Sequence, residues 1–213
     1  MKTDLDTLLY TWPQSVITDN DLAVLLSGTR DRRYALIKRA IRDEKLIHLK
    51  KGLYFIGKPF KTALPNLFEI AQRIYGPSYI SLESALSYHN WIPEAVYTVT
   101  SVCPKRNNHF MTSLGVFNYS HVPNKNFYMS VERVESEAGT FLMATPIKAL
   151  ADYVYVYRKL WHNFEDVSLD LRVEMENIRS IDKQEIELLV KNYPSRRVGT
   201  FLKKLLKERA NGH

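Results

Sequence analysis

The most restrictive feature of this chain is a basic segment near its N-terminus, residues 28–61. It holds eleven lysine and arginine residues against three acidic ones, a local charge of +8, whereas the formal charge of all 213 residues is +7. Apolar side chains at three-and-four spacing predict an amphipathic helix over residues 30–45. Two β-rich runs follow, residues 46–49 and 53–56, separated by Lys50, Lys51 and Gly52. This order predicts a helix followed by a β-hairpin with a basic turn.

Two shorter helices are expected before this segment. Residues 3–10 place several leucines on one side, and a second helix begins after Thr18, whose hydroxyl is suited to capping it. Gly28 is suited to ending that helix, and Thr29 to capping the next one. Three helices followed by a basic hairpin predict an N-terminal winged helix-turn-helix, which we assign to residues 1–61.

The helix over residues 30–45 is expected to turn one face to the core and another to DNA. Tyr34, Ile37 and Ile41 form the expected core stripe, whereas Arg32, Ala35, Arg39 and Arg42 point to the other side. A small residue between long cations lets a helix lie deep in the major groove of double-stranded DNA. We interpret Arg32 and Arg33 as base contacts, and Lys38, Arg39 and Arg42 as phosphate anchors. The candidate DNA-binding residues are Thr29, Arg30, Arg32, Arg33, Lys38, Arg39, Arg42, Lys50 and Lys51. A winged helix that docks a protein and never touches DNA is the alternative.

The chain is longer than a typical single domain, so residues 62–213 are expected to form a second domain. Strands are predicted at residues 79–80, 96–102, 115–121, 127–134 and 140–143. Helices are predicted at residues 67–74, 82–89, 147–159, 166–178, 183–191 and 196–209. The expected fold class is α+β, with a mixed α/β second domain, a mostly antiparallel sheet and a helical C-terminal end.

No reactive site is evident from the sequence, so we expect no catalytic residue, no metal and no cofactor. The lone Cys103 has no histidine partner arrangement, and Glu132, Glu135 and Glu137 are typical of a solvated strand edge. His89 and His109 lack acids at ligand spacing. No apolar run approaches the roughly 18 residues of a membrane span, and no signal peptide is evident, so a cytoplasmic location without membrane partners is expected.

The basic C-terminal helix, residues 196–209, permits two interpretations. Val198, Phe201, Leu202 and Leu205 lie on one side of it, with lysines on the other. This pattern is typical of a helix packed on its own domain with a solvated outer face. A second nucleic-acid or partner surface is the alternative.

Two segments of the second domain carry a resemblance to a known family. The first is residues 78–89 (SYISLESALSYH), followed by Ile92, Pro93 and an expected strand, and the second is residues 144–152 (ATPIKALAD). Together with the N-terminal helix-turn-helix, they resemble the AbiEi-type antitoxin family of abortive-infection systems. Where that family has Pro-Glu-Lys, this chain has Pro146, Ile147 and Lys148.

The resemblance implies a function in phage defence. In that family the winged helix represses transcription from the operon's own promoter, where inverted repeats are the expected operator. The C-terminal domain counteracts a cognate nucleotidyltransferase-like toxin encoded nearby, generally without a stable complex, in what is called a type IV toxin–antitoxin system. We therefore expect a DNA-binding autorepressor and antitoxin. An interaction module that neutralises a partner protein by direct contact is the alternative.

Overall fold

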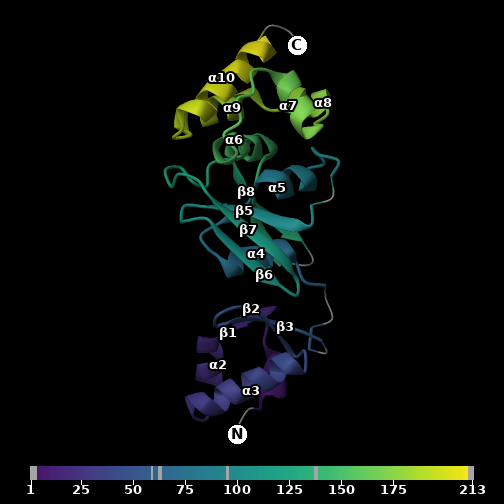
Figure 1. Cartoon of the computed structure of the whole chain (residues 1–213), viewed down its shortest axis with the longest axis vertical. Coiled ribbons are helices and arrows are strands. Elements are labelled where there is room, and N and C mark those ends of the chain that lie inside the picture. The colour runs from purple at the N-terminus through teal and green to yellow at the C-terminus, as the bar shows by residue number, and fades with distance from the viewer. Residues whose placement is uncertain (1–3, 59, 62–63, 95, 137–138, 211–213) are drawn as a thin grey trace.

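The computed structural model describes residues 4–58, 60–61, 64–94, 96–136 and 139–210. The molecule is elongated, with an N-terminal unit at one end, a six-stranded sheet in the middle and helices at the other end (Figure 1). This arrangement confirms the predicted α+β class and the helical C-terminal end. The predicted domain boundary lies between residues 61 and 62, and residues 62 and 63 are outside the described ranges.

The N-terminal unit combines three helices with a small antiparallel sheet. Its elements are α1 (Leu5–Thr11), β1 (Val16–Thr18), α2 (Asp19–Leu25), α3 (Arg30–Arg42), β2 (Leu46–Lys50) and β3 (Leu53–Ile56). The strands pair in the order β1-β3-β2. Thr18 and Asp21 form a reciprocal capping box that starts α2, as expected for a threonine at this position. Strand β1 was not predicted, because three residues are too few for a period-two pattern.

Both faces of the central strand β3 are buried, which explains its uninterrupted apolar run. Alternate residues of a strand point to opposite faces. Tyr54 and Ile56 pack in the core beneath the three helices, whereas Leu53 and Phe55 join the main core of the second unit. Val16 and Leu49 also belong to that main core. The two units are therefore joined by shared apolar packing as well as by the linker.

The second unit is built on a six-stranded sheet with the order β6-β7-β5-β4-β9-β8. Its strands are β4 (Tyr79–Ile80), β5 (Thr98–Cys103), β6 (Asn108–Thr112), β7 (Gly115–His121), β8 (Val131–Ser136) and β9 (Gly139–Ala144). The β5–β7 and β4–β9 pairs are parallel and the other three are antiparallel. The helices α4 (Leu67–Ile74) and α5 (Leu82–Tyr88) pack on this sheet (Figure 1).

The remaining helices follow the sheet in the chain and form the C-terminal end. They are α6 (Pro146–Val156), α7 (Phe164–Leu171), α8 (Met175–Ser180), α9 (Lys183–Asn192) and α10 (Arg196–Ala210). Val198, Phe201, Leu202 and Leu205 of α10 are buried, so its apolar side packs on its own domain. No helix in the described part of the chain combines the length and the apolarity that crossing a membrane requires.

Two local predictions were wrong, and one strand was missed. The helix expected over residues 166–178 is split into α7 and α8, because Arg172 takes the left-handed conformation at φ 52° and ends α7. The strand expected from residue 127 begins only at Val131, since residues 124–131 form successive turns. Residues 108–112, for which no strand was predicted, form the edge strand β6, whose exposed polar side chains do not show a clear alternating pattern.

Candidate nucleic-acid interface

Helix α3 starts at a well-defined cap. The Thr29 Oγ1 atom accepts a hydrogen bond from the Arg32 backbone N–H at 3.3 Å, and Arg33 Nη1 donates to the Gly28 carbonyl oxygen at 2.6 Å. Gly28 has φ 117°, which a residue with a side chain rarely adopts. A Cβ atom at this position would also lie only 3.1 Å from the Arg32 Cδ atom. The start of α3 is therefore tightly fixed relative to α2.

A groove of about 650 Å³ lies between α2, α3 and the β2–β3 hairpin. Its cationic lining consists of Arg30, Arg33, Lys38 and Lys51, with His48 beside them. Asp19 is the acidic residue in that lining, and its Oδ1 atom accepts a hydrogen bond from the Tyr54 hydroxyl at 2.9 Å. The groove is thus strongly basic, and its four cations come from two separate elements, α3 and the hairpin.

The opposite flank of α3 has a different charge balance. Arg39 lies there beside α1, in a shallow depression whose lining includes Asp4, Asp6, Asp43 and Lys45. Lys45 Nζ bonds Asp6 at 2.5 Å, and the exposed Arg42 Nε pairs with Asp43 at 3.1 Å. Exposed pairs of this kind contribute little to stability, so they leave Arg42 available. Arg32 is exposed as well.

Tyr34 does not lie in the core, contrary to the predicted stripe. Its side chain is 68% exposed and lines the basic groove, whereas Ile37 is buried and Ile41 is half-buried. Ala40 occupies the core position instead. The side of α3 that faces the core is therefore shifted away from Tyr34 and toward Ala40. The spacing of apolar residues could not reveal this, because Tyr34 and Ala40 each lie three residues from Ile37, on either side of it.

The two hairpin lysines point in different directions. Lys51 is exposed at the turn, which is held to α2 by a hydrogen bond of 3.0 Å from the Asp19 N–H to the Gly52 carbonyl. Lys50 Nζ instead donates to the Ile74 carbonyl oxygen at 2.5 Å, in the second unit. Partial burial, and then the nearby Lys105, lower the pKa of Lys50. A register shift between His48 and Lys50 re-aims the lysine, as β-bulges do.

A second polar cluster lies inside the second unit, where the segments 78–89 and 144–152 meet. Asp152 is fully buried and accepts four hydrogen bonds, from Lys148 Nζ at 2.5 Å and from the hydroxyls of Tyr79, Ser81 and Tyr193 at 2.8–2.9 Å. Tyr79 and Ser81 come from the first segment, and Lys148 and Asp152 from the second. Ile147, next to Lys148 in the second segment, is fully buried in the core.

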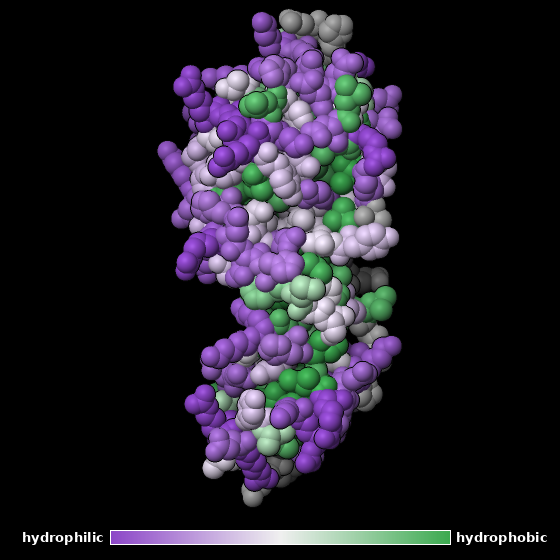
Figure 2. All heavy atoms as spheres, viewed as in Figure 1, coloured by the Kyte–Doolittle hydropathy of each residue, from purple (hydrophilic) through white to green (hydrophobic). Residues whose placement is uncertain are grey.

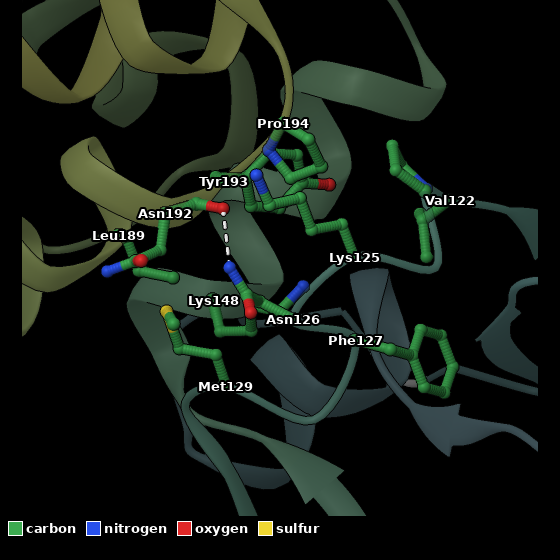
Figure 3. Close-up of a pocket in the computed structure, with 11 residues that line it drawn as sticks. Val122, Lys125, Asn126, Phe127, Met129, Lys148, Leu189, Asn192, Tyr193 and Pro194 are labelled. Atoms are coloured by element: carbon green, nitrogen blue, oxygen red, sulfur yellow. Dashed lines mark hydrogen bonds between the residues drawn. The ribbon is translucent and has the colours of Figure 1, made fainter.

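The surroundings of Lys148 are closed. Figure 3 shows Lys148 and Tyr193 in the lining of a small pocket, with Asn126 Nδ2 donating to the Asn192 carbonyl oxygen at 3.2 Å across it. Lys148 is 3% exposed and also lies over the rings of Tyr79 and Tyr193, at 5.1 and 4.7 Å from the centroids. The cluster is thus built to hold α6 and the C-terminal helices on the sheet, with no room for a macromolecular substrate.

The other residues considered for chemistry are dispersed. Glu132 and Glu135 are exposed on β8, where Arg133 pairs with Glu135 at 3.1 Å, and Glu137 lies outside the described residues. Burial raises the pKa of the Cys103 thiol, which is the opposite of what a nucleophile needs. In the described ranges, no three His, Cys, Asp or Glu side chains are grouped so that they could hold a metal ion.

The chain matches no protein-family model and no curated protein. Sequence reasoning found the basic helix and the hairpin, but it missed the roles of Tyr34, Asp19 and Tyr54 in shaping the groove. It also missed the Asp152 cluster, whose members are spread from Tyr79 to Tyr193.

Proposed function

We propose that this chain is a DNA-binding transcriptional repressor whose N-terminal unit is a winged helix-turn-helix. The observation that carries the proposal is the basic groove between α3 and the hairpin. It brings cations from two elements to one exposed surface, and its one acidic lining residue is already hydrogen-bonded to Tyr54. A surface of this kind favours a polyanion.

The length of α3 suits the major groove of duplex DNA. Helix α3 has 13 residues and is therefore about 20 Å long, and an α-helix fits the major groove. Lys51 projects beside it from a hairpin that Asp19 holds in place, as a wing would contact the neighbouring backbone. The fixed geometry means that little order has to be gained on binding, which favours affinity.

We further propose that the second unit is an antitoxin domain that counteracts a nucleotidyltransferase-like toxin encoded nearby. The support is the resemblance of residues 78–89 and 144–152 to the AbiEi-type family. These two segments, distant in the sequence, meet at Asp152, so they belong to one structural unit. Two segments that both resemble one domain are expected to pack in a single core, so their contact supports the proposal.

Two experiments test the proposal. In the first, the full chain is mixed with a duplex that spans the region upstream of its own coding sequence, and binding is compared with that to an unrelated duplex of equal length. We expect tighter binding to the upstream duplex. Equal binding to both, or none, would contradict the repressor assignment.

The second experiment addresses the antitoxin assignment. The neighbouring gene is expressed with and without this chain, and growth and complex formation are measured. We expect growth to be rescued without a stable complex on gel filtration. A stoichiometric complex together with absent DNA binding would favour the direct-contact interaction module instead.

A further inference from the structure

The two flanks of α3 offer DNA two different surfaces, and the structure distinguishes between them. We infer that α3 meets DNA along the side that faces the hairpin, and that Tyr34 on that side determines sequence specificity. We call Arg30, Tyr34 and Lys38 the hairpin-side stripe. This inference rests on the proposed DNA-binding function and specifies the orientation of the helix within it.

The first observation is the geometry of the groove. Residues 30, 34 and 38 are spaced four apart, so they follow one another along one side of the helix. All three side chains are exposed, and all three line the groove that Lys51 and His48 line from the hairpin. A duplex that contacts both α3 and the hairpin turn must lie over this groove. The stripe is therefore the part of α3 that such a duplex meets.

The second observation is the charge on either flank. The groove lining holds four lysine and arginine residues and one aspartate. The opposite depression holds Arg39 and Lys45 against three aspartates, and Lys45 is already bonded to one of them. Phosphates repel carboxylates, so the second flank is a poor surface for a DNA backbone.

The third observation is Tyr34 itself. An aromatic side chain that is 68% exposed contributes little to the core, yet it stands between Arg30 and Lys38 at the mouth of the groove. Cations spaced on either side suit phosphates, which carry no sequence information. A ring at the centre suits base edges and thymine methyl groups in the major groove, which do carry it. Tyr34 is thus placed to read sequence while its neighbours provide affinity.

The experiment compares variants that remove equal charge from the two flanks of the full-length chain. Arg30→Ala with Lys38→Ala is the test pair, and Arg32→Ala with Arg39→Ala is the matched control pair. Tyr34→Ala is the specificity variant. Each is assayed against duplexes enriched from a random-sequence library by the unmodified chain, and against poly(dI-dC) as the non-specific duplex. Thermal unfolding verifies that each variant folds, as expected for exposed positions.

We expect the Arg30/Lys38 pair to weaken binding to both duplexes and to reduce the salt-dependence slope by about 2. The Arg32/Arg39 pair should weaken binding to both duplexes less than the Arg30/Lys38 pair does, because three aspartates lie on that flank. Tyr34→Ala should lower the ratio of specific to non-specific affinity about tenfold, while binding to poly(dI-dC) remains nearly unchanged.

The outcomes distinguish a failure of this inference from a failure of the proposed DNA-binding function. A greater loss from the Arg32/Arg39 pair than from the Arg30/Lys38 pair would overturn the orientation and leave DNA binding intact. An unchanged specificity ratio in Tyr34→Ala would overturn the role of the tyrosine. If the unmodified chain enriches no sequence and does not bind poly(dI-dC), the proposed repressor function itself is wrong.

Discussion

The Nζ atom of Lys50 donates a hydrogen bond of 2.5 Å to the Ile74 carbonyl oxygen, which ties the β2–β3 hairpin to the end of α4. A cation at a helix C-terminus also interacts favourably with the helix dipole. The neighbouring Lys51 makes no comparable contact in the described residues and is exposed. Two adjacent lysines of one turn thus have separate roles, one joining the units and the other facing solvent.

These roles predict opposite consequences for two neighbouring substitutions. Lys50→Ala should lower the free energy of unfolding by roughly 1 kcal/mol, because the Ile74 carbonyl loses a charged donor. Lys51→Ala should change it by less than about 0.5 kcal/mol, yet weaken binding to duplex DNA. Urea unfolding and fluorescence anisotropy measure the two effects. Equal stability losses in both variants would show that Lys50 does not anchor the hairpin.

The buried Asp152 cluster should be highly sensitive to the loss of its acceptor. Asp152→Ala leaves the Lys148 ammonium and three hydroxyls without their common partner, and should cost about 3–5 kcal/mol of unfolding free energy. Lys148→Met should cost less, because the carboxylate keeps its three hydroxyl donors.

The double variant Lys148→Met with Asp152→Leu should be more stable than Asp152→Ala, since no unpaired charge remains buried. Urea unfolding of the three variants measures the order of their unfolding free energies. The control is Lys183→Met, which breaks an exposed pair with Glu187 and should cost less than about 0.5 kcal/mol. A loss of similar size at Lys183 would contradict a special role for the buried pair.

The same cluster predicts a loss of stability in alkali. Burial, and then the Asp152 charge, raise the pKa of Tyr79 and of Tyr193 well above the ordinary phenol value. In the unfolded chain these phenols ionise near pH 10, whereas the folded chain retains their protons. Their contribution is therefore fully present below about pH 10 and is lost as the pH rises further.

Urea unfolding at a series of pH values above neutrality measures this loss. The control is Tyr193→Phe, which has one buried phenol fewer and should show a shallower decline in unfolding free energy, whatever its stability at neutral pH. A decline of identical steepness in Tyr193→Phe would mean that Tyr193 ionises equally in both states.

The shared core predicts that the N-terminal unit is incomplete by itself. A fragment that ends at Lys61 exposes Val16, Leu49, Leu53 and Phe55, which are buried against the second unit in the full chain. It should bind 1-anilinonaphthalene-8-sulfonate and associate on gel filtration. The full chain serves as the control. A monomeric fragment that does not bind the dye would show that the second unit is not needed to cover this face.

Local patterns predicted much of the fold, because helix periodicity and caps are properties of neighbouring residues. The ranges expected for α4, β4 and β7 agree with the structure residue for residue. The predictions that failed depended on distant parts of the chain or on single backbone conformations. Arg172 in the left-handed region splits a helix that propensity alone would continue.

The candidate interface could be predicted only in part from the sequence, because its geometry also depends on distant contacts and on local backbone irregularities. The sequence shows that α3 is rich in lysine and arginine. Which of these cations face the hairpin depends on the packing of Ile37 and Ala40 in the core. A bulge in β2 sends Lys50 to the second unit, which no spacing rule indicates. Asp152 meets Tyr79 and Tyr193 only after the chain has folded.

The most direct test of DNA binding by the basic groove is the affinity of the full chain for its own upstream duplex, measured by anisotropy across a range of salt concentrations. Four cations of the groove at phosphates predict a slope of about −3.6 in the logarithmic plot of affinity against salt. We predict a slope near that value, together with preference over an unrelated duplex. Affinity that is absent, or that does not change with salt, would contradict the proposed interface.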